Sequence, residues 1–164
     1  MADAFDPAAL ERLEPLIGEW SMSVGGGPDA KWEPSEDGPG QAAGVSVFEW
    51  TLGRRFVTQR SEITHPEAPD AISIIAFDAD GGGYRQHYFD SRGVVRLYSM
   101  TFADGVWELL RTAPDFSPLS FSQRFHGELS DDGTVIEGRW ETSGDGSSWE
   151  LDFELVYRRI RTGS

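Results

Sequence analysis

Closely spaced turn signals divide most of the chain into segments of strand length, and this pattern limits the possible folds more than any other feature. Gly-rich or Asp-Gly turns occur near residues 53–54, 78–83, 90–93, 104–105, 131–133 and 143–148. Such short connections join antiparallel neighbours. Because a long meander leaves two exposed edges unless it closes, the sequence predicts an all-β, up-and-down antiparallel barrel. We expect about ten strands, at residues 20–24, 45–52, 56–63, 72–77, 84–89, 94–102, 106–111, 120–129, 134–142 and 149–160.

Two other segments complete a single domain over residues 1–164. Asp6 can cap a short helix, Pro7 suits its first position, and apolar residues at helical spacing predict a helix over about residues 7–17. Residues 25–43 are rich in Gly, Pro and acidic residues and predict a long flexible loop that contains Trp32.

Charge and composition exclude several classes of partner. The formal net charge is −14, whereas a nucleic-acid binder needs a basic face and an anionic membrane repels an acidic surface. There are no cysteines, and the first residues have neither the basic start nor the apolar run of a signal peptide. We therefore expect a cytoplasmic protein, monomeric or homodimeric, whose partner is a small hydrophobic ligand rather than nucleic acid or membrane.

Alternation along the last predicted strand indicates what points into the barrel. Aromatic and aliphatic residues alternate there with acids, and a period of two places these two sets on opposite faces. The residues predicted to point inward on this strand are Trp149, Leu151, Phe153, Leu155, Tyr157 and Arg159. On earlier strands they are Phe48, Trp50 and Leu52; Trp107, Leu109 and Arg111; Phe121, Gln123 and Phe125; and Ile136, Gly138 and Trp140.

The predicted interior suggests a binding cavity. Interior volume grows with strand number, so ten strands should leave space even beside many aromatic side chains. Some inward positions look polar, including Arg111, Gln123 and Tyr157, and Arg60 joins them if residues 56, 58 and 60 face inward. An apolar pocket with a few convergent polar groups is the usual form of a small-molecule site.

A Gly-x-Trp sequence opens the first predicted strand at Gly18–Trp20, directly after the helix. This pattern resembles the calycins, which include lipocalins, fatty-acid-binding proteins and nitrobindin-like haem barrels. The resemblance to lipocalins implies that Trp20 closes one end of the barrel. It also implies that an arginine of the last strand, here Arg159, covers the tryptophan as a cation–π pair.

Three longer runs resemble a family of small uncharacterised bacterial calycin-like proteins. They are FEWTLGRRF at residues 48–56, YRQHYFDSRG at residues 84–93 and DDGTVIEGRW at residues 131–140. The family has no agreed activity, so this resemblance supports the fold and does not identify a ligand.

The sequence predicts no cofactor or metal, with haem as an alternative. Nitrobindin-like barrels bind haem iron through a histidine near the C-terminal strands, and residues 149–160 contain none. The remaining candidates are His65, His87 and His126, whose spacing indicates no metal site.

Catalytic motifs are also missing from the sequence. There is no Gly-x-Ser-x-Gly nucleophile elbow. Acid–base chemistry by His87, Tyr88, Tyr98 or Arg60 remains open, but His87 and Tyr88 are adjacent and only one of them can point inward. Periodicity over residues 84–89 does not choose between them.

The sequence thus favours a protein that binds a small, mostly apolar molecule inside the barrel. An isomerase- or cyclase-type enzyme using the same cavity, and a haem protein, are the alternatives. The predicted ligand-binding residues are Arg60, His87, Tyr98, Arg111 and Gln123, with Trp50, Phe125 and Trp140 as apolar wall.

Overall fold

The computed structural model describes residues 6–25, 44–63, 69–115 and 120–162. These residues form one short α-helix, one 3-10 helix and ten strands. The elements are α1 (Pro7–Glu11), η1 (Glu14–Leu16), β1 (Gly18–Gly25), β2 (Gly44–Thr51), β3 (Phe56–Ile63), β4 (Ala71–Asp78), β5 (Gly83–Asp90), β6 (Val95–Ala103), β7 (Val106–Arg111), β8 (Ser122–Leu129), β9 (Val135–Ser143) and β10 (Glu150–Thr162). The predicted loop over residues 25–43, including Trp32, lies almost entirely outside the described residues, as does His65.

The strands form a closed antiparallel barrel in which sequence neighbours are also spatial neighbours. Closure depends on β1, which pairs with β2 on one side and with β10 on the other. Gly18 lies opposite Phe48 of β2, and Trp20 lies opposite Arg159 of β10. The ten-stranded, up-and-down barrel predicted from the turn signals is confirmed.

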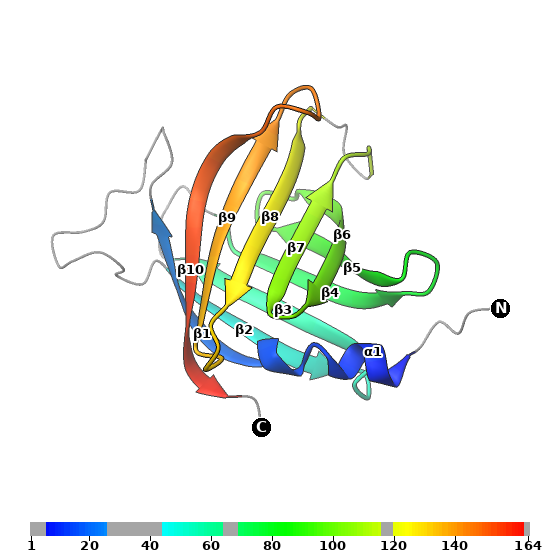
Figure 1. Cartoon of the computed structure of the whole chain (residues 1–164), viewed down its shortest axis with the longest axis vertical. Helices are drawn as coiled ribbons and strands as arrows, with labels where there is room; N and C mark the ends of the chain where they lie inside the picture. The colour runs from blue at the N-terminus through cyan, green and yellow to red at the C-terminus, as the bar shows by residue number, and fades with distance from the viewer. Residues whose placement is uncertain (1–5, 26–43, 64–68, 116–119, 163–164) are drawn as a thin grey trace, which may run out of the picture.

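The N-terminal segment lies across one end of the barrel, the end at which β10 finishes (Figure 1). The Asp6 side chain caps α1 by accepting from the backbone N–H groups of Ala8 (3.1 Å) and Ala9 (3.2 Å). The hydroxyl of Tyr84 on β5 donates to the carbonyl of Ala9 and ties the helix to the barrel wall. The regular helix stops at Glu11, short of the predicted end, because Pro15 lacks an N–H group and its ring disfavours α geometry before it.

Trp20 and Arg159 complete this closed end. The indole of Trp20 is fully buried and donates through Nε1 to the carbonyl of Leu16 (3.0 Å). The Arg159 guanidinium lies 4.1 Å from the centre of the Trp20 ring, the stacking expected from the resemblance. Arg159 also donates to the carbonyls of Ile17 (2.7 Å), Gly133 (2.9 Å) and Pro15. One side chain therefore joins β10, the β8–β9 turn and the N-terminal segment.

A bulge in β10 corrects the prediction for its first residues. The pairing register shifts between Leu151 and Phe153. Leu151 pairs with Glu141, whose carboxylate bonds Arg124 on the outer face, and the Arg124 guanidinium lies 4.2 Å from the Trp149 ring centre. Trp149 and Leu151 are therefore outside the barrel, and only Phe153 and the later members of the predicted row point inward.

Of the residues predicted to point inward on the second strand, Leu52 lies outside the barrel and Trp50 packs against the core at the helix-covered end. Leu52 is 72% exposed, because β2 ends at Thr51 and Leu52 occupies a turn with a positive φ of 50°. Trp50 is half-buried at the helix-covered end, where its Nε1 donates to Glu14 (2.8 Å) and Arg54 stacks on its ring.

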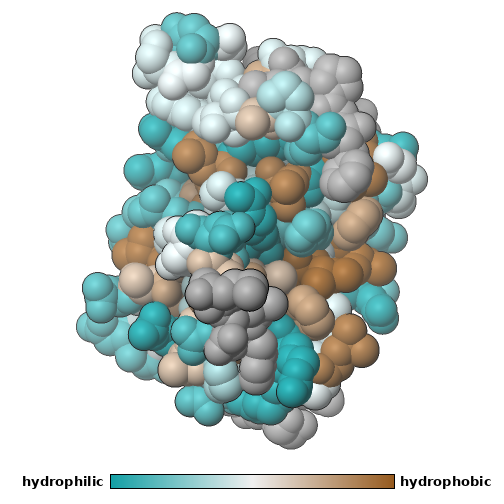
Figure 2. All heavy atoms as spheres, turned by 90° about the vertical axis from the view of Figure 1, so that its right-hand side faces the viewer, coloured by the Kyte–Doolittle hydropathy of each residue, from teal (hydrophilic) through white to brown (hydrophobic). Residues whose placement is uncertain are grey.

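The outer face carries scattered apolar residues. In the view of Figure 2 they occur in small groups among hydrophilic residues rather than as one continuous field. The described exposed large apolar residues are Val45, Leu52, Ile72, Ile74, Phe89, Leu110 and Ile160. None of the helices in the described ranges has the length and apolarity of a membrane span.

We predict that Arg159→Met lowers the free energy of unfolding by about 1–3 kcal/mol, because three backbone carbonyls lose their donor and Trp20 loses its cation. Arg158→Met, on the exposed neighbour, is the matched control and should change little. Urea denaturation monitored by tryptophan fluorescence measures both. Equal midpoints for the two variants would show that Arg159 does not hold the closed end together.

Candidate functional site

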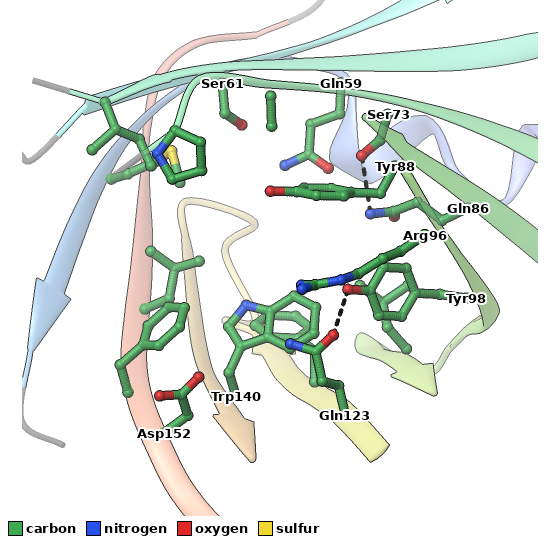
Figure 3. A pocket seen from close by; sticks show the side chains of 18 of the residues that line it. Gln59, Ser61, Ser73, Gln86, Tyr88, Arg96, Tyr98, Gln123, Trp140 and Asp152 are labelled. Atoms are coloured by element: carbon green, nitrogen blue, oxygen red, sulfur yellow. Dashed lines mark hydrogen bonds between the residues drawn. The ribbon is translucent and has the colours of Figure 1, made fainter. Parts of the chain in front are cut away.

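A cavity of about 350 Å³ lies inside the barrel. It extends from the buried indole of Trp107 toward the end opposite the helix, where Pro69, Arg92, Phe121 and Asp152 line its mouth. This volume is at the lower end of the range for small-molecule sites. Figure 3 shows side chains from several strands converging on it.

One wall of the cavity is polar and comes from β3, β4 and β5. Gln59, Ser61, Ser73 and Gln86 line it and are all at least nine-tenths buried. Gln59 Nε2 donates to Ser46 Oγ (3.1 Å), and the Ser46 and Ser61 hydroxyls share a hydrogen bond of 3.1 Å. Gln86 Nε2 donates to Ser73 Oγ (3.3 Å). Amides and hydroxyls thus replace the aliphatic side chains that usually fill a small barrel.

Two buried polar atoms on the cavity lining have no hydrogen-bond partner among the described residues. They are Oε1 of Gln86 and Nε1 of Trp107, whose residues are 3% and 2% exposed. A buried polar group without a partner costs roughly 1–3 kcal/mol. These atoms belong to residues of the cavity wall but are enclosed by side chains and not open to the cavity.

The opposite wall is aromatic and comes from β6 to β10. Trp107 and Phe125 have ring centres 4.9 Å apart, Phe125 and Trp140 5.2 Å, and Trp140 and Tyr98 5.6 Å. Phe153 continues this wall from β10. Gly138 provides space for the Phe125 ring, because a Cβ there would come within 2.5 Å of it. These rings present a rigid apolar surface to the cavity.

Hydrogen bonds hold the polar ends of two wall tyrosines. Tyr98 donates to Oε1 of Gln123 (3.0 Å), and Tyr88 donates to Asp90 (2.9 Å). Burial raises the pKa of both phenols, and the Asp90 hydrogen bond raises the pKa of Tyr88 further. Both tyrosines therefore remain neutral donors at ordinary pH.

Two of the three arginines near the mouth have aspartate partners. Arg92 pairs with Asp90 (2.7 Å). Arg111 and Asp115 are both buried and form a bidentate pair at 2.8 and 2.9 Å. Asp115 also accepts from the backbone N–H of Leu97 (2.9 Å), so the Arg111 pair fixes the segment after β7 onto β6.

Arg96 differs from these two. It lines the cavity and points into it from β6, as Figure 3 shows. No carboxylate of the described residues forms an ion pair with Arg96, which lies 5.8 Å from the centre of the Phe121 ring and beside Tyr98. Asp152 lies across the mouth on β10, where burial raises the pKa of its carboxyl group.

The structure brings four of the predicted ligand-binding residues together. Tyr98, Gln123, Phe125 and Trp140 all line the cavity, and their contact with a ligand remains a prediction. Arg111 is buried, as expected of an inward residue, but it is bound to Asp115 and does not line the cavity.

Three other predicted ligand residues are wrongly placed. Arg60 is exposed on the outer face of β3, because Val57, Gln59 and Ser61 occupy the inner face. His87 lies on the outer face of β5, since its neighbours Gln86 and Tyr88 line the cavity. Trp50 lies at the closed end beside η1, away from the cavity.

Sequence reasoning missed the polar wall and Arg96. Strand parity was the available signal. If Gln86 and Tyr88 point inward, the register also places inward Ser73, which pairs with Tyr88, and Gln59, which pairs with Ser73. The register across β5 and β6 pairs Tyr88 with Arg96 and therefore places Arg96 on the same inner face.

Neither of the described histidines lines the cavity, so neither is placed to hold haem iron there. His87 and His126 are both on the outer face, where His126 contacts Glu108 and Glu128. Neither imidazole can reach an iron held between the walls. In the part of the chain that the structure describes, no group of three metal-ligating side chains is assembled.

Comparison with known proteins supports the fold. Neither the protein-family models nor the curated proteins contain a match to this chain. Among solved structures, the chain is similar to Rv2717c from M. tuberculosis, with a TM-score of 0.57 and 16% identity over 96% of this chain and 99% of the other. At that identity the similarity shows the shared barrel fold alone and carries no activity to this chain.

Removing the cation of the buried Arg111–Asp115 pair should be costly. We predict that Arg111→Met lowers the free energy of unfolding by about 3–5 kcal/mol, since it leaves the Asp115 carboxylate buried without its partner. Arg85→Met breaks an exposed pair with Asp78 and should cost at most about 1 kcal/mol. Denaturant titration of the two variants checks this, and a cost for Arg111→Met no larger than that for Arg85→Met would contradict a structural role.

Tyrosine ionisation gives a second test of burial. The pKa is raised, chiefly by burial, at all four tyrosines, Tyr84, Tyr88, Tyr98 and Tyr157. The unfolded chain should therefore lose its phenolic protons at lower pH than the folded protein does. Folding stability should be unaffected by these groups below their unfolded pKa and should fall as pH rises above it. Ultraviolet difference absorbance at alkaline pH measures the effect, and coincident titrations of folded and urea-unfolded protein would contradict it.

Proposed function

We propose that this protein binds a small, mostly apolar molecule inside the barrel. A cavity of about 350 Å³, with four buried polar side chains on one wall and aromatic rings on the other, carries the proposal. A core selected only for stability gains nothing from a cavity lined by buried polar atoms, because cavity surface and unmade hydrogen bonds both cost free energy. Both costs fall when a molecule fills the space and bonds the polar wall.

The two walls define what such a molecule offers. Its apolar part packs against Trp107, Phe125, Trp140 and Phe153. Its polar groups meet the amides and hydroxyls of the wall formed by Gln59, Ser61, Ser73 and Gln86. The volume fits a compact ring compound rather than an extended lipid chain or a macrocycle.

Binding without turnover fits the described groups better than catalysis. The cavity contains no described histidine, and its tyrosines have raised pKa values and act as neutral donors. Asp152 is the one described carboxylate on the lining, and it lies at the exposed mouth. A cytoplasmic carrier or sensor of a small molecule matches this chemistry and the acidic surface.

Filling the cavity should abolish binding. Ser73→Phe places a ring in the cavity, whereas Ile74→Phe adds the same ring to the outer face of the same strand. We expect the neutral fluorophore phenylnaphthylamine to bind wild type and Ile74→Phe at one site and to bind Ser73→Phe at least about tenfold more weakly. Native mass spectrometry of freshly purified wild type should also show a small adduct that Ser73→Phe lacks.

Circular dichroism and thermal melting establish that both variants are folded. Equal fluorophore binding by Ser73→Phe and Ile74→Phe, or no binding by wild type, would contradict a ligand site inside the barrel.

A further inference from the structure

We infer that the cavity is specific for small aromatic acids, whose carboxylate is held by Arg96 while the ring lies against the aromatic wall. This inference rests on the proposed function and names the chemical class of its ligand.

The arginines near the mouth differ in whether they have an acidic partner. Arg92 and Arg111 each have an aspartate partner, at 2.7 and 2.8 Å, and each partner is itself fixed by a second hydrogen bond from Tyr88 or from the Leu97 backbone. Arg96 points into the cavity with no carboxylate partner among the described residues. A guanidinium partly removed from water is stabilised most by a planar carboxylate that accepts two of its N–H groups.

Arg96 lies beside Tyr98, whose hydroxyl is already held by Gln123. Tyr98 is 2% exposed, and its proton is committed to Gln123 at 3.0 Å. Arg96 lies close enough to Tyr98 to oppose the rise in pKa that burial causes there. Tyr98, held by Gln123, therefore positions the arginine over the cavity, and no carboxylate of the described residues pairs with its charge.

The aromatic wall lies next to the positive charge of Arg96. Tyr98 contacts Trp140 at 5.6 Å, and Trp140 contacts Phe125 at 5.2 Å, so the aromatic wall begins beside Arg96 and continues to Trp107. A flat ring attached to a carboxylate can lie along this wall while its acidic group remains at Arg96. The only other described charge without a partner on the lining, Asp152, lies across the mouth at an exposed position.

Three matched probes separate charge from shape: naphthoate, naphthamide and naphthylmethylammonium, which differ in the charge of one substituent. Isothermal titration calorimetry should show naphthoate binding to wild type about tenfold or more tightly than naphthamide, with the cation weakest, because a charge-assisted hydrogen bond exceeds a neutral one.

Arg96→Met should weaken naphthoate binding about tenfold or more while changing naphthamide binding little, and Arg96→Lys should recover part of the loss. Arg60→Met removes the same charge from the outer face and is the control for net charge; it should leave the order of the probes unchanged. Retained phenylnaphthylamine binding by Arg96→Met shows that the cavity is intact.

The outcomes distinguish this inference from the proposed function. Equal binding of naphthoate and naphthamide to wild type, or a preference for naphthoate that survives Arg96→Met, overturns the acid specificity and leaves a neutral-ligand site. Absence of binding by all three probes and by phenylnaphthylamine overturns the proposed function together with this inference.

Discussion

The pairing of β1 with β10 is the constraint on which the rest of this structure depends. Without it, the ten strands would form an open sheet with two unpaired edges. With it, the strand number sets an interior wider than side chains alone need to fill. Arg159 stabilises this closure directly, since it lies opposite Trp20 across the β1–β10 pair and bonds the N-terminal segment that covers the same end. The closed end is therefore packed, and the remaining volume lies toward the other end.

The interior is divided between two kinds of surface, and the division follows the order of strands around the barrel. The polar amides and hydroxyls come from β3 to β5, and the aromatic rings come from β6 to β10. Each surface is fixed before a ligand arrives, by the Ser46–Gln59–Ser61 hydrogen bonds on one side and by interlocked rings on the other. Such preorganisation lowers the ordering cost of binding.

Sequence patterning predicted the barrel well because turn chemistry is local. Asp-Gly and Gly-rich turns require particular backbone angles, and alternation was informative wherever the inner face is apolar, as at Trp107 and Leu109 or at Phe125 and Trp140. Alternation failed to predict the inward residues where the inner face is polar. On β3 the inward Gln59 and Ser61 are no more apolar than the outward Thr58 and Arg60, so hydrophobic periodicity could not choose the face. The same ambiguity on β5 led to the wrong placement of His87.

The other errors have different physical causes. The bulge in β10 reverses the faces of Trp149 and Leu151, and a period-two pattern cannot reveal an inserted residue. Arg111 was correctly predicted as inward, but its partner Asp115 lies beyond the end of β7, and local alternation says nothing of such a contact. Arg96 follows only from the register that pairs it with Tyr88. Inward polar groups were thus hardest to predict because they break the pattern from which the fold was predicted.

A crystal structure of the protein grown with naphthoate tests the central claim most directly. We expect electron density for naphthoate between the two walls, with its ring against Trp107 and Trp140 and its carboxylate at Arg96. A barrel whose side chains have filled the space, or a probe found only on the outer face, would contradict it.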